Sequence, residues 1–503
     1  MDKRMQRAKV NAASTLAHQL VTTVCGLIVP WIMIDTFGSA VYGATTSIAQ
    51  FLSYISLLEG GIGRVARGAF YKPLADGDND NISRIYLATK RFFLIVGIVF
   101  MAYTLVLSFT YYDIADITGF TRKYIFALVI AISIGKFAEY MGGISNITLF
   151  NADQKQYVVN SAYIITNIIN TFLMVILVSS GIDILWVRFC SSLVFVLRPI
   201  VFTLYRKKHY NIKKSVERAV LKNKYTGIAQ HAAYVVQNNT DIIMLTVFAD
   251  LKLIAVYSVY HLVCFSIRNI TASFTGGMEA AFGEMIAKGE DEALYSAYEK
   301  YKCMLAFFTV ALFGATAVLI VPFVKIYTSG VTDTEYSQPV FAMLMILSEA
   351  INCLILPCFN MTIAANKLKE TQMGAYGEAA VNLIISFILV LWNPLIGVAI
   401  GTLVSSLYKS VFYIVYSGKN ILKINVKRML FDLFVCVLVL IVIGILGNLI
   451  IMTIPVTNYL TWILCGFITV ALTGVIAALL SAVMYRKNVF SIIIKKQKEE
   501  RSK

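Results

Sequence analysis

Apolar stretches long enough to cross a lipid bilayer recur along nearly the whole chain, and they constrain the fold more than any other feature. A transmembrane helix needs about 20 mostly apolar residues. We predict fourteen such spans, at 14–35, 41–62, 91–112, 124–148, 157–180, 183–205, 226–249, 253–278, 303–328, 337–364, 374–392, 395–416, 429–452 and 459–484. Of the 503 residues, 58% are hydrophobic and 14% are charged, which excludes a soluble, a disordered and a collagen-like chain. The sequence therefore predicts an all-α polytopic membrane protein.

The distribution of positive charge predicts how the spans are oriented. Most of the 44 Lys and Arg residues lie at the N-terminus, in connectors after even-numbered spans and in the C-terminal tail. Because Lys and Arg accumulate in cytoplasmic loops, we predict that both termini are cytoplasmic. The net charge of +16, which includes the basic connector 207–224, is then explained by contact with anionic lipid, and no nucleic-acid partner is predicted.

The sequence matches itself at a constant offset of 212 residues. Gly77 aligns with Gly289 and Tyr86 aligns with Tyr298, in one unbroken register. Six spans per repeat give both halves the same orientation, so we predict a pseudo-two-fold axis along the membrane normal and a central cavity. The last two spans have no counterpart. The predicted domains are an N-lobe at 1–212, a C-lobe at 213–424 and an appended pair with a basic tail at 425–503.

Several spans carry polar or charged side chains at membrane depth. An ionisable residue at the centre of a span costs about 2.5–3.5 kcal/mol, so it is expected to face protein or water. The span 226–249 places His231, Asn238 and Asp241 at helical spacing on one face. Such polar stripes are explained either by a functional site or by hydrogen bonds between helices.

For three further charged residues within spans, the sequence indicates less clearly which groups they contact. Lys136 and Glu139 are spaced so that they can pair across one helical turn. Lys409 receives no assignment, because it lies near a span end or on a lipid-facing side.

Arginines at membrane depth indicate the class of substrate. Arg188 and Arg268 lie within spans, and Arg64 and Arg67 follow the second span directly. Since guanidinium groups bind phosphate oxygens through two parallel hydrogen bonds, these residues favour an anionic head group over an organic cation. Arg64, Arg67 and Arg198 are explained equally well as anchors at the cytoplasmic interface.

No pattern of catalytic or metal-binding residues accompanies the spans. The sequence has no phosphate-binding P-loop, and its four His and eight Cys residues lack the spacing of metal ligands or of a disulfide framework. We therefore predict no cofactor, no metal and no enzyme activity.

Several segments together resemble the bacterial polysaccharide and O-antigen flippases of the multidrug/oligosaccharidyl-lipid/polysaccharide exporter superfamily. They are Asn11 at the start of the first span, FGSAVYG at 37–43, LLEGGIGRVARGAF at 57–70, GEAAVNLIISFILV at 377–390 and GVAIGTLVSSL at 397–407. The resemblance implies a MATE-like fold of two six-helix lobes around a central cavity. It also implies that the chain moves an undecaprenyl-diphosphate-linked oligosaccharide from the cytoplasmic to the outer leaflet of a bacterial plasma membrane. The appended pair would accommodate the lipid tail, as in the related lipid II flippases.

The predicted site combines the basic and polar residues at membrane depth. Residues expected to bind the diphosphate or the sugar are Arg64, Arg67, Arg188, Arg268, Asn238 and His231. Candidates for coupling to H⁺ or Na⁺ are the acidic residues at depth, Glu59, Asp241 and Glu349. Polysaccharide polymerases or glycosyltransferases are candidate partners.

Three other functions are alternatives to a flippase. A multidrug or organic-cation antiporter of the same superfamily usually has twelve helices and an acidic residue within its first span, whereas Asp35 here lies at the end of that span. A polymerase or ligase acting on the lipid-linked sugar would be expected to have a large external loop, and none is predicted. A purely structural scaffold does not explain the charges within the spans.

Overall fold

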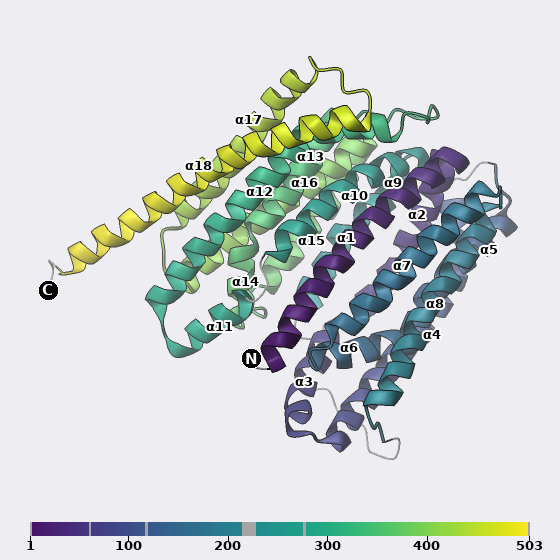
Figure 1. The fold of residues 1–503 in the computed structure, drawn as a ribbon, viewed down its shortest axis with the longest axis horizontal. Helices are drawn as coiled ribbons and strands as arrows, with labels where there is room; N and C mark the ends of the chain where they lie inside the picture. The colour runs from purple at the N-terminus through teal and green to yellow at the C-terminus, as the bar shows by residue number, and fades with distance from the viewer. Residues whose placement is uncertain (1–2, 60–61, 116–118, 214–227, 275–277, 501–503) are drawn as a thin grey trace. The chain divides into compact units, whose positions relative to one another are not determined.

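The first half of the chain is helical in the computed structural model, which describes residues 3–59, 62–115, 119–213, 228–274 and 278–500. The helices of this half are α1 (Lys3–Phe37), α2 (Ser39–Ser53), the 3₁₀ helix η1 (Tyr54–Glu59), α3 (Ile62–Asp76), α4 (Asn79–Ile114), α5 (Arg122–Ala138), the π-helix η2 (Glu139–Gly143), α6 (Ile144–Ala152), α7 (Gln156–Ser179), α8 (Ile184–His209) and α9 (Ile228–Phe248). Helix α1 lies along α7 (Figure 1). The chain forms two compact units, Met1–Ser258 and Val259–Lys503.

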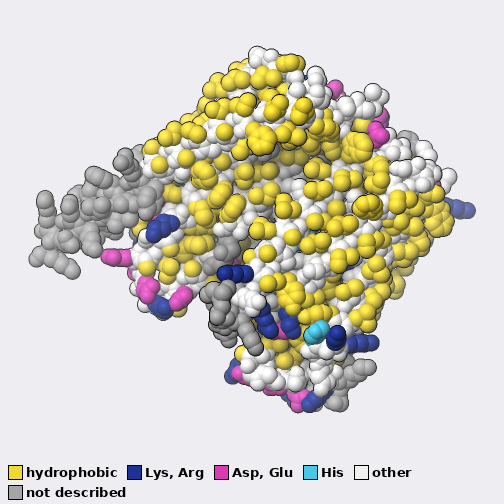
Figure 2. All heavy atoms as spheres, viewed as in Figure 1, with side chains coloured by type: hydrophobic (Ala, Val, Ile, Leu, Met, Phe, Trp, Pro, Cys, Tyr) yellow, Lys and Arg dark blue, Asp and Glu magenta, His cyan; other side chains and the backbone are white. Residues whose placement is uncertain are grey.

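The second half is also helical, and the described residues contain no β-strand. Its helices are α10 (Leu251–Ser273), α11 (Met278–Lys288), α12 (Asp291–Tyr327), α13 (Pro339–Leu354), α14 (Leu356–Ala364), α15 (Gln372–Val390), α16 (Pro394–Asn420), α17 (Val426–Ile451) and α18 (Tyr459–Glu500). The prediction of an all-α polytopic membrane protein is confirmed. Hydrophobic side chains cover the flanks of the helices, while charged side chains gather near helix ends (Figure 2).

Twelve helices of the described residues are long and apolar enough to cross a membrane, where the sequence predicts fourteen spans. The two that do not meet this measure are the predicted spans 41–62 and 226–249. The first forms the fifteen-residue helix α2 followed by η1, so its α-helical part is short. The second forms α9, whose run of Gln, Asn, Thr and Asp lowers its hydropathy.

The predicted repeat recurs in the helices themselves. Helix α4 begins at Asn79 and α12 at Asp291, which is the same offset of 212 residues. The turns before these helices place Gly77 at φ 69° and Gly289 at φ 70°, a backbone conformation that favours glycine. Each helix begins twelve residues before its predicted span, because polar turns extend it. At the start of α4, Asn81 donates two hydrogen bonds to the Asp78 carboxyl, and both lower its pKa. The bond from the backbone N–H has the larger effect, and the bond from the side chain has the smaller.

Each unit has a buried aromatic core built from equivalent residues. Phe70 and Tyr86 are buried in the first unit, and their counterparts Phe282 and Tyr298 are buried in the second. Full burial of one large apolar side chain contributes about 1.5–3 kcal/mol. The repeat therefore preserves the residues that hold α3 against α4 and α11 against α12.

The appended helices α17 and α18 pack on α12 (Figure 1). Three of their side chains donate hydrogen bonds to carbonyl oxygens of α12: Asn448 to Ala317 at 2.9 Å, Trp462 to Leu319 at 3.0 Å and Thr473 to Ala311 at 3.0 Å. These bonds fix the pair on the second unit.

The residues of α12 explain why the pair packs there and not on the equivalent helix α4. Ile98 of α4 is 58% exposed, whereas its counterpart Val310 is fully buried. Gly314 of α12 leaves room for the side chains of Ile443 and Thr473, and the small side chain of Ala317 faces Gly444 of α17. The larger side chains of α4 instead form a surface suited to lipid.

A buried charge cluster joins α12 to α17. Lys302 Nζ lies 3.0 Å from a carboxylate oxygen of Glu299 and 2.6 Å from one of Asp432. All three side chains are largely buried. The cluster places one cation between two carboxylates.

Glycines allow α15 and α16 to pack with their backbones in close contact. A Cβ added at Gly397 would lie 2.5 Å from the carbonyl oxygen of Leu389, which is a backbone atom with little freedom to move. We expect Gly397→Ala to destabilise the protein by about 1–3 kcal/mol through overpacking. Thermal unfolding of the purified variant measures this loss.

Gly474 of α18 provides the matched control, since a Cβ there would meet nothing within 4 Å. Gly474→Ala is expected to unfold at or above the wild-type temperature, because alanine favours a helix over glycine. Equal unfolding temperatures of Gly397→Ala and wild type would contradict the close packing of α15 and α16.

Candidate functional site

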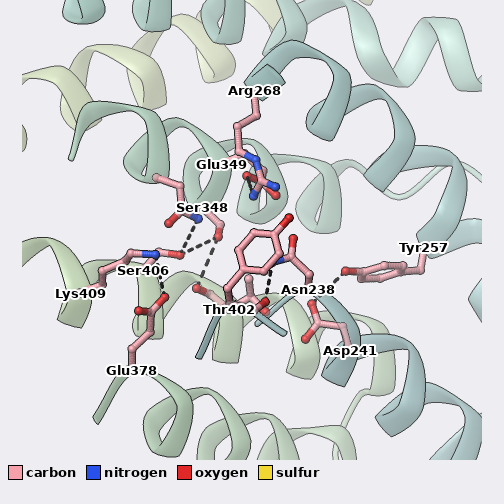
Figure 3. A network of polar contacts seen from close by, with 12 residues as sticks. Asn238, Asp241, Tyr257, Arg268, Ser348, Glu349, Glu378, Thr402, Ser406 and Lys409 are labelled. Atoms are coloured by element: carbon pink, nitrogen blue, oxygen red, sulfur yellow. Dashed lines mark hydrogen bonds and ion pairs between the residues drawn. The ribbon is translucent and has the colours of Figure 1, made fainter. Parts of the chain in front are cut away.

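The second unit holds an ion pair of two predicted site residues. Arg268 Nη1 of α10 donates to Glu349 Oε2 of α13 at 2.8 Å (Figure 3). The side chains are 17% and 8% exposed. The structure thus brings together a predicted phosphate ligand and a predicted ion-coupling residue, which the sequence analysis treats separately.

A second buried pair lies between α15 and α16. Lys409 Nζ donates to Glu378 Oε1 at 2.9 Å, and the carboxylate is almost fully buried (Figure 3). Lys409 therefore faces protein rather than lipid, and it joins the charged groups of this unit. Sequence reasoning missed it because a lysine near a span end is commonly an interfacial anchor.

Hydroxyl and amide groups connect α13, α15 and α16 between these charges. Ser348 and Asn352 of α13 hydrogen-bond to Ser406 of α16 at 3.1 Å, and Asn382 of α15 donates to Thr402 at 3.1 Å. The side-chain oxygens of Asn352 and Asn382 have no hydrogen-bond partner among the described residues. A buried acceptor of this kind is suited to bind water or a cation.

The first unit has a corresponding charge at Arg198 of α8. Its guanidinium donates to Thr166 at 2.8 Å and to Asn167 at 2.7 Å, and it lies 4.5 Å from the ring centroid of Tyr163. The hydroxyl of Tyr163 donates in turn to Glu139 of η2 at 3.2 Å. Arg198 thus lies in a polar network with α7 and does not reach out to the interface.

Lys409 takes the corresponding place in the second unit. Arg198 bonds to Thr166 and Lys409 bonds to Glu378, and Thr166 and Glu378 are equivalent positions of the repeat. When the two halves are aligned at the offset of 212 residues, Arg198 and Lys409 differ by one position. Each unit therefore places one cation at the same point between two neighbouring helices.

Arg188 holds two helices of the first unit together. Its Nη2 donates to the Thr45 hydroxyl of α2 at 2.7 Å, and its buried Nε has no hydrogen-bond partner among the described residues. An anionic group could accept a hydrogen bond from this unsatisfied N–H.

Glu59 and the π-helix η2 form another contact at depth. The Tyr140 hydroxyl donates to Glu59, and Lys136 lies 5.6 Å from the ring centroid of Tyr140. No ion pair joins Lys136 to Glu139 in the part of the chain that the structure describes, so the predicted pairing is wrong. The backbone between the two residues is regular α-helix, and the π-turn begins only at Glu139. The two side chains have other partners, since Lys136 lies over the ring of Tyr140 and Glu139 accepts a hydrogen bond from Tyr163.

The polar face of α9 packs on α2 and η1. His231 Nε2 lies 2.7 Å from the carbonyl oxygen of Ser56, and Gln50 donates to the carbonyl of Asn238 at 2.8 Å. Asp241 is 2% exposed and accepts a hydrogen bond from Tyr257 at 3.0 Å (Figure 3). The three predicted residues of α9 thus take part in helix packing within the first unit.

The two remaining predicted arginines lie on α3. Arg67 is half-buried on this helix. The side chain of Arg64 is outside the described residues, as is most of the basic connector 207–224. All eight cysteines are free, as expected from their spacing.

Solved structures of two kinds of transporter share this fold. The lipid II flippase MurJ in an inward closed conformation is 14% identical, with a TM-score of 0.60, and the match covers 88% of this chain and 98% of that chain. An inward-facing multidrug resistance transporter of the MATE family, in the MOP superfamily, is 13% identical, with a TM-score of 0.57 and coverage of 83% and 98%. The MATE multidrug transporter DinF-BH is 13% identical, with a TM-score of 0.59 and coverage of 82% and 95%.

No protein-family model matches the sequence, and no curated protein matches it by sequence. At these identities the structural likeness establishes the fold. The chain is a multi-pass membrane protein with the MATE-like fold of transporters.

Proposed function

We propose that the chain is a flippase that moves undecaprenyl-diphosphate-linked oligosaccharide from the cytoplasmic to the outer leaflet of a bacterial plasma membrane, by alternating access. The observation that carries the proposal is that both units hold arginines at membrane depth, Arg188 and Arg198 in the first and Arg268 in the second. A diphosphate cannot leave water without such partners, because an unpaired buried charge costs several kcal/mol.

Two acidic side chains at depth already have cationic partners, which argues against an organic cation as the substrate. Glu349 is paired with Arg268 and Glu378 with Lys409. Since these two carboxylates already have cationic partners, they are poorly suited to attract an organic cation. In the first unit, by contrast, the buried Nε of Arg188 has no hydrogen-bond partner among the described residues and could donate to a phosphate oxygen.

Ion coupling is a further part of the proposal. Asp241 and Glu59 each accept a hydrogen bond from a tyrosine, and Glu349 contacts Arg268. A carboxylate with few water contacts can change its affinity for H⁺ or Na⁺ when its partners move, which is what coupling requires.

A vesicle assay tests the flippase proposal. The purified chain is reconstituted into liposomes that contain a fluorescent polyprenyl-diphosphate-linked oligosaccharide, and a membrane-impermeant quencher reports the fraction in the outer leaflet. Liposomes with protein are expected to expose most of the probe to the quencher, and protein-free liposomes about half. If protein does not increase the exposed fraction, the proposal is refuted.

A multidrug antiporter is the second candidate, since two of the solved structures with this fold are described as multidrug transporters. The same vesicles, loaded with a fluorescent organic cation and given an H⁺ or Na⁺ gradient, distinguish the two. Movement of the cation without movement of the lipid-linked oligosaccharide would favour the antiporter.

A further inference from the structure

The contact between Arg268 and Glu349 leaves the arginine already engaged when no substrate is present. One carboxylate oxygen lies 2.8 Å from Nη1, and the guanidinium carbon lies 4.5 Å from the ring centroid of Phe265. The ring and the carboxylate together fix the orientation of the guanidinium. A phosphate group can bind this edge of Arg268 only by displacing Glu349 or by sharing Nη1 with it.

A carrier that returns empty must also keep its buried charges compensated. An isolated guanidinium at this depth would be costly, whereas an ion pair with a carboxylate lowers that cost. We propose that Glu349 is a built-in counter-ion, which holds Arg268 in the empty carrier and is displaced by a phosphate group of the substrate. This inference rests on the proposed flippase function.

The groups around Glu349 determine what happens when it is displaced. Among the described residues, Glu349 pairs with Arg268 and interacts electrostatically with His261 and Cys264 of α10 and with Cys353 of α13. From α16, the cation Lys409 is paired with Glu378. A displaced carboxylate beside a bound diphosphate would suffer repulsion between like charges, which is relieved when it takes one proton from water. The proton returns to water when Arg268 and Glu349 pair again.

Displacement therefore predicts linkage between proton uptake and phosphate binding. Binding to wild type takes up more protons than binding to a variant in which Glu349 cannot titrate. A role of Glu349 in structure alone would not produce this difference, so proton uptake separates the two explanations.

Binding of farnesyl diphosphate to the full chain in lipid nanodiscs tests the proposal. Calorimetry in buffers of different ionisation enthalpy gives both the affinity and the protons taken up. Glu349→Gln is expected to bind the probe about tenfold more tightly than wild type, because the neutral amide competes weakly for Arg268. It is also expected to take up fewer protons on binding.

Glu299→Gln is the matched control, since Glu299 is also a buried carboxylate paired with a cation but belongs to the cluster that anchors α17. It is expected to bind the probe as wild type does. If Glu349→Gln does not fold, Glu349→Asp replaces it in the test. The shorter side chain weakens the pair with Arg268, so we expect an intermediate gain in affinity for the probe.

Three results bear on the proposal in different ways. Tighter binding with reduced proton uptake in the Glu349 variant supports it. Unchanged or weaker binding by a folded Glu349 variant, while wild type binds the probe, overturns the counter-ion role and leaves the flippase proposal standing. Absence of binding to folded wild type and folded variants alike overturns both.

Discussion

Replacing Arg268 and Glu349 together by glutamine is expected to yield a folded protein whose flipping rate is reduced about 100-fold or more. A hydrogen bond to a charged group contributes about 1.5–3 kcal/mol, and about 1.4 kcal/mol corresponds to a factor of ten in rate. The pair lies in a site of low exposure, where such a contact has its largest effect. The quencher assay in liposomes measures the rate.

The double variant is preferred to Arg268→Gln because the single change would leave the Glu349 carboxylate buried without its cation. Loss of one partner of a buried pair typically costs about 3–5 kcal/mol, so low expression would obscure the effect on flipping. The single variant is expected to unfold at a lower temperature than the double variant. Wild-type flipping by the double variant, at equal membrane levels, would refute a role for Arg268 in substrate binding.

The helices could be predicted from sequence because apolar length is a local pattern, and the repeat because its matches keep one constant offset. Apolar runs of sufficient length have few stable alternatives to helices in a bilayer. The repeat shows in Gly77 and Gly289, which keep one backbone conformation, and in the buried pair Tyr86 and Tyr298. Helix ends were less predictable, since the polar turns before α4 and α12 extend helices whose apolar part starts later.

The partners of the charged residues could not be predicted, because hydropathy records depth in the membrane and not the direction of a side chain. Arg268 and Glu349 are 81 residues apart, and the contact depends on how α10 and α13 pack. The sequence does not assign a partner to Lys409 for the same reason. One signal was available: Glu378 lies at depth in a neighbouring span, and a buried carboxylate requires a cationic partner.

The wrong pairing of Lys136 with Glu139 shows a second limit of sequence patterns. The prediction assumed regular α-helical spacing, in which residues three apart share a face. That spacing holds as far as Glu139, where the π-turn begins, but spacing alone does not fix the partner. Glu139 accepts a hydrogen bond from Tyr163 of α7, and Lys136 lies over the ring of Tyr140. Such single π-turns often occur at functional sites, which makes this segment a useful place for further variants.

Replacing Lys302 by methionine is expected to be among the most destabilising single changes in the second unit. Methionine has a similar shape, but it leaves the carboxylates of Glu299 and Asp432 close together without the cation between them. Breaking a buried ion pair in this way typically costs about 3–5 kcal/mol, and repulsion between the two carboxylates adds to that cost. Thermal unfolding in detergent and the yield of monodisperse protein measure the effect.

The triple variant Lys302→Met, Glu299→Gln and Asp432→Asn separates charge from packing. Because it removes all three charges, we expect it to recover most of the lost stability, as replacement of a whole buried ionic cluster commonly does. Lys90→Met is the matched control, since Lys90 is the equivalent residue of α4, and no carboxylate of the described residues lies within ion-pair distance of it. It is expected to change the unfolding temperature little. If Lys302→Met and Lys90→Met are equally stable, the cluster does not hold α17 on α12, and apolar packing with the hydrogen bond from Asn448 to the carbonyl of Ala317 must suffice.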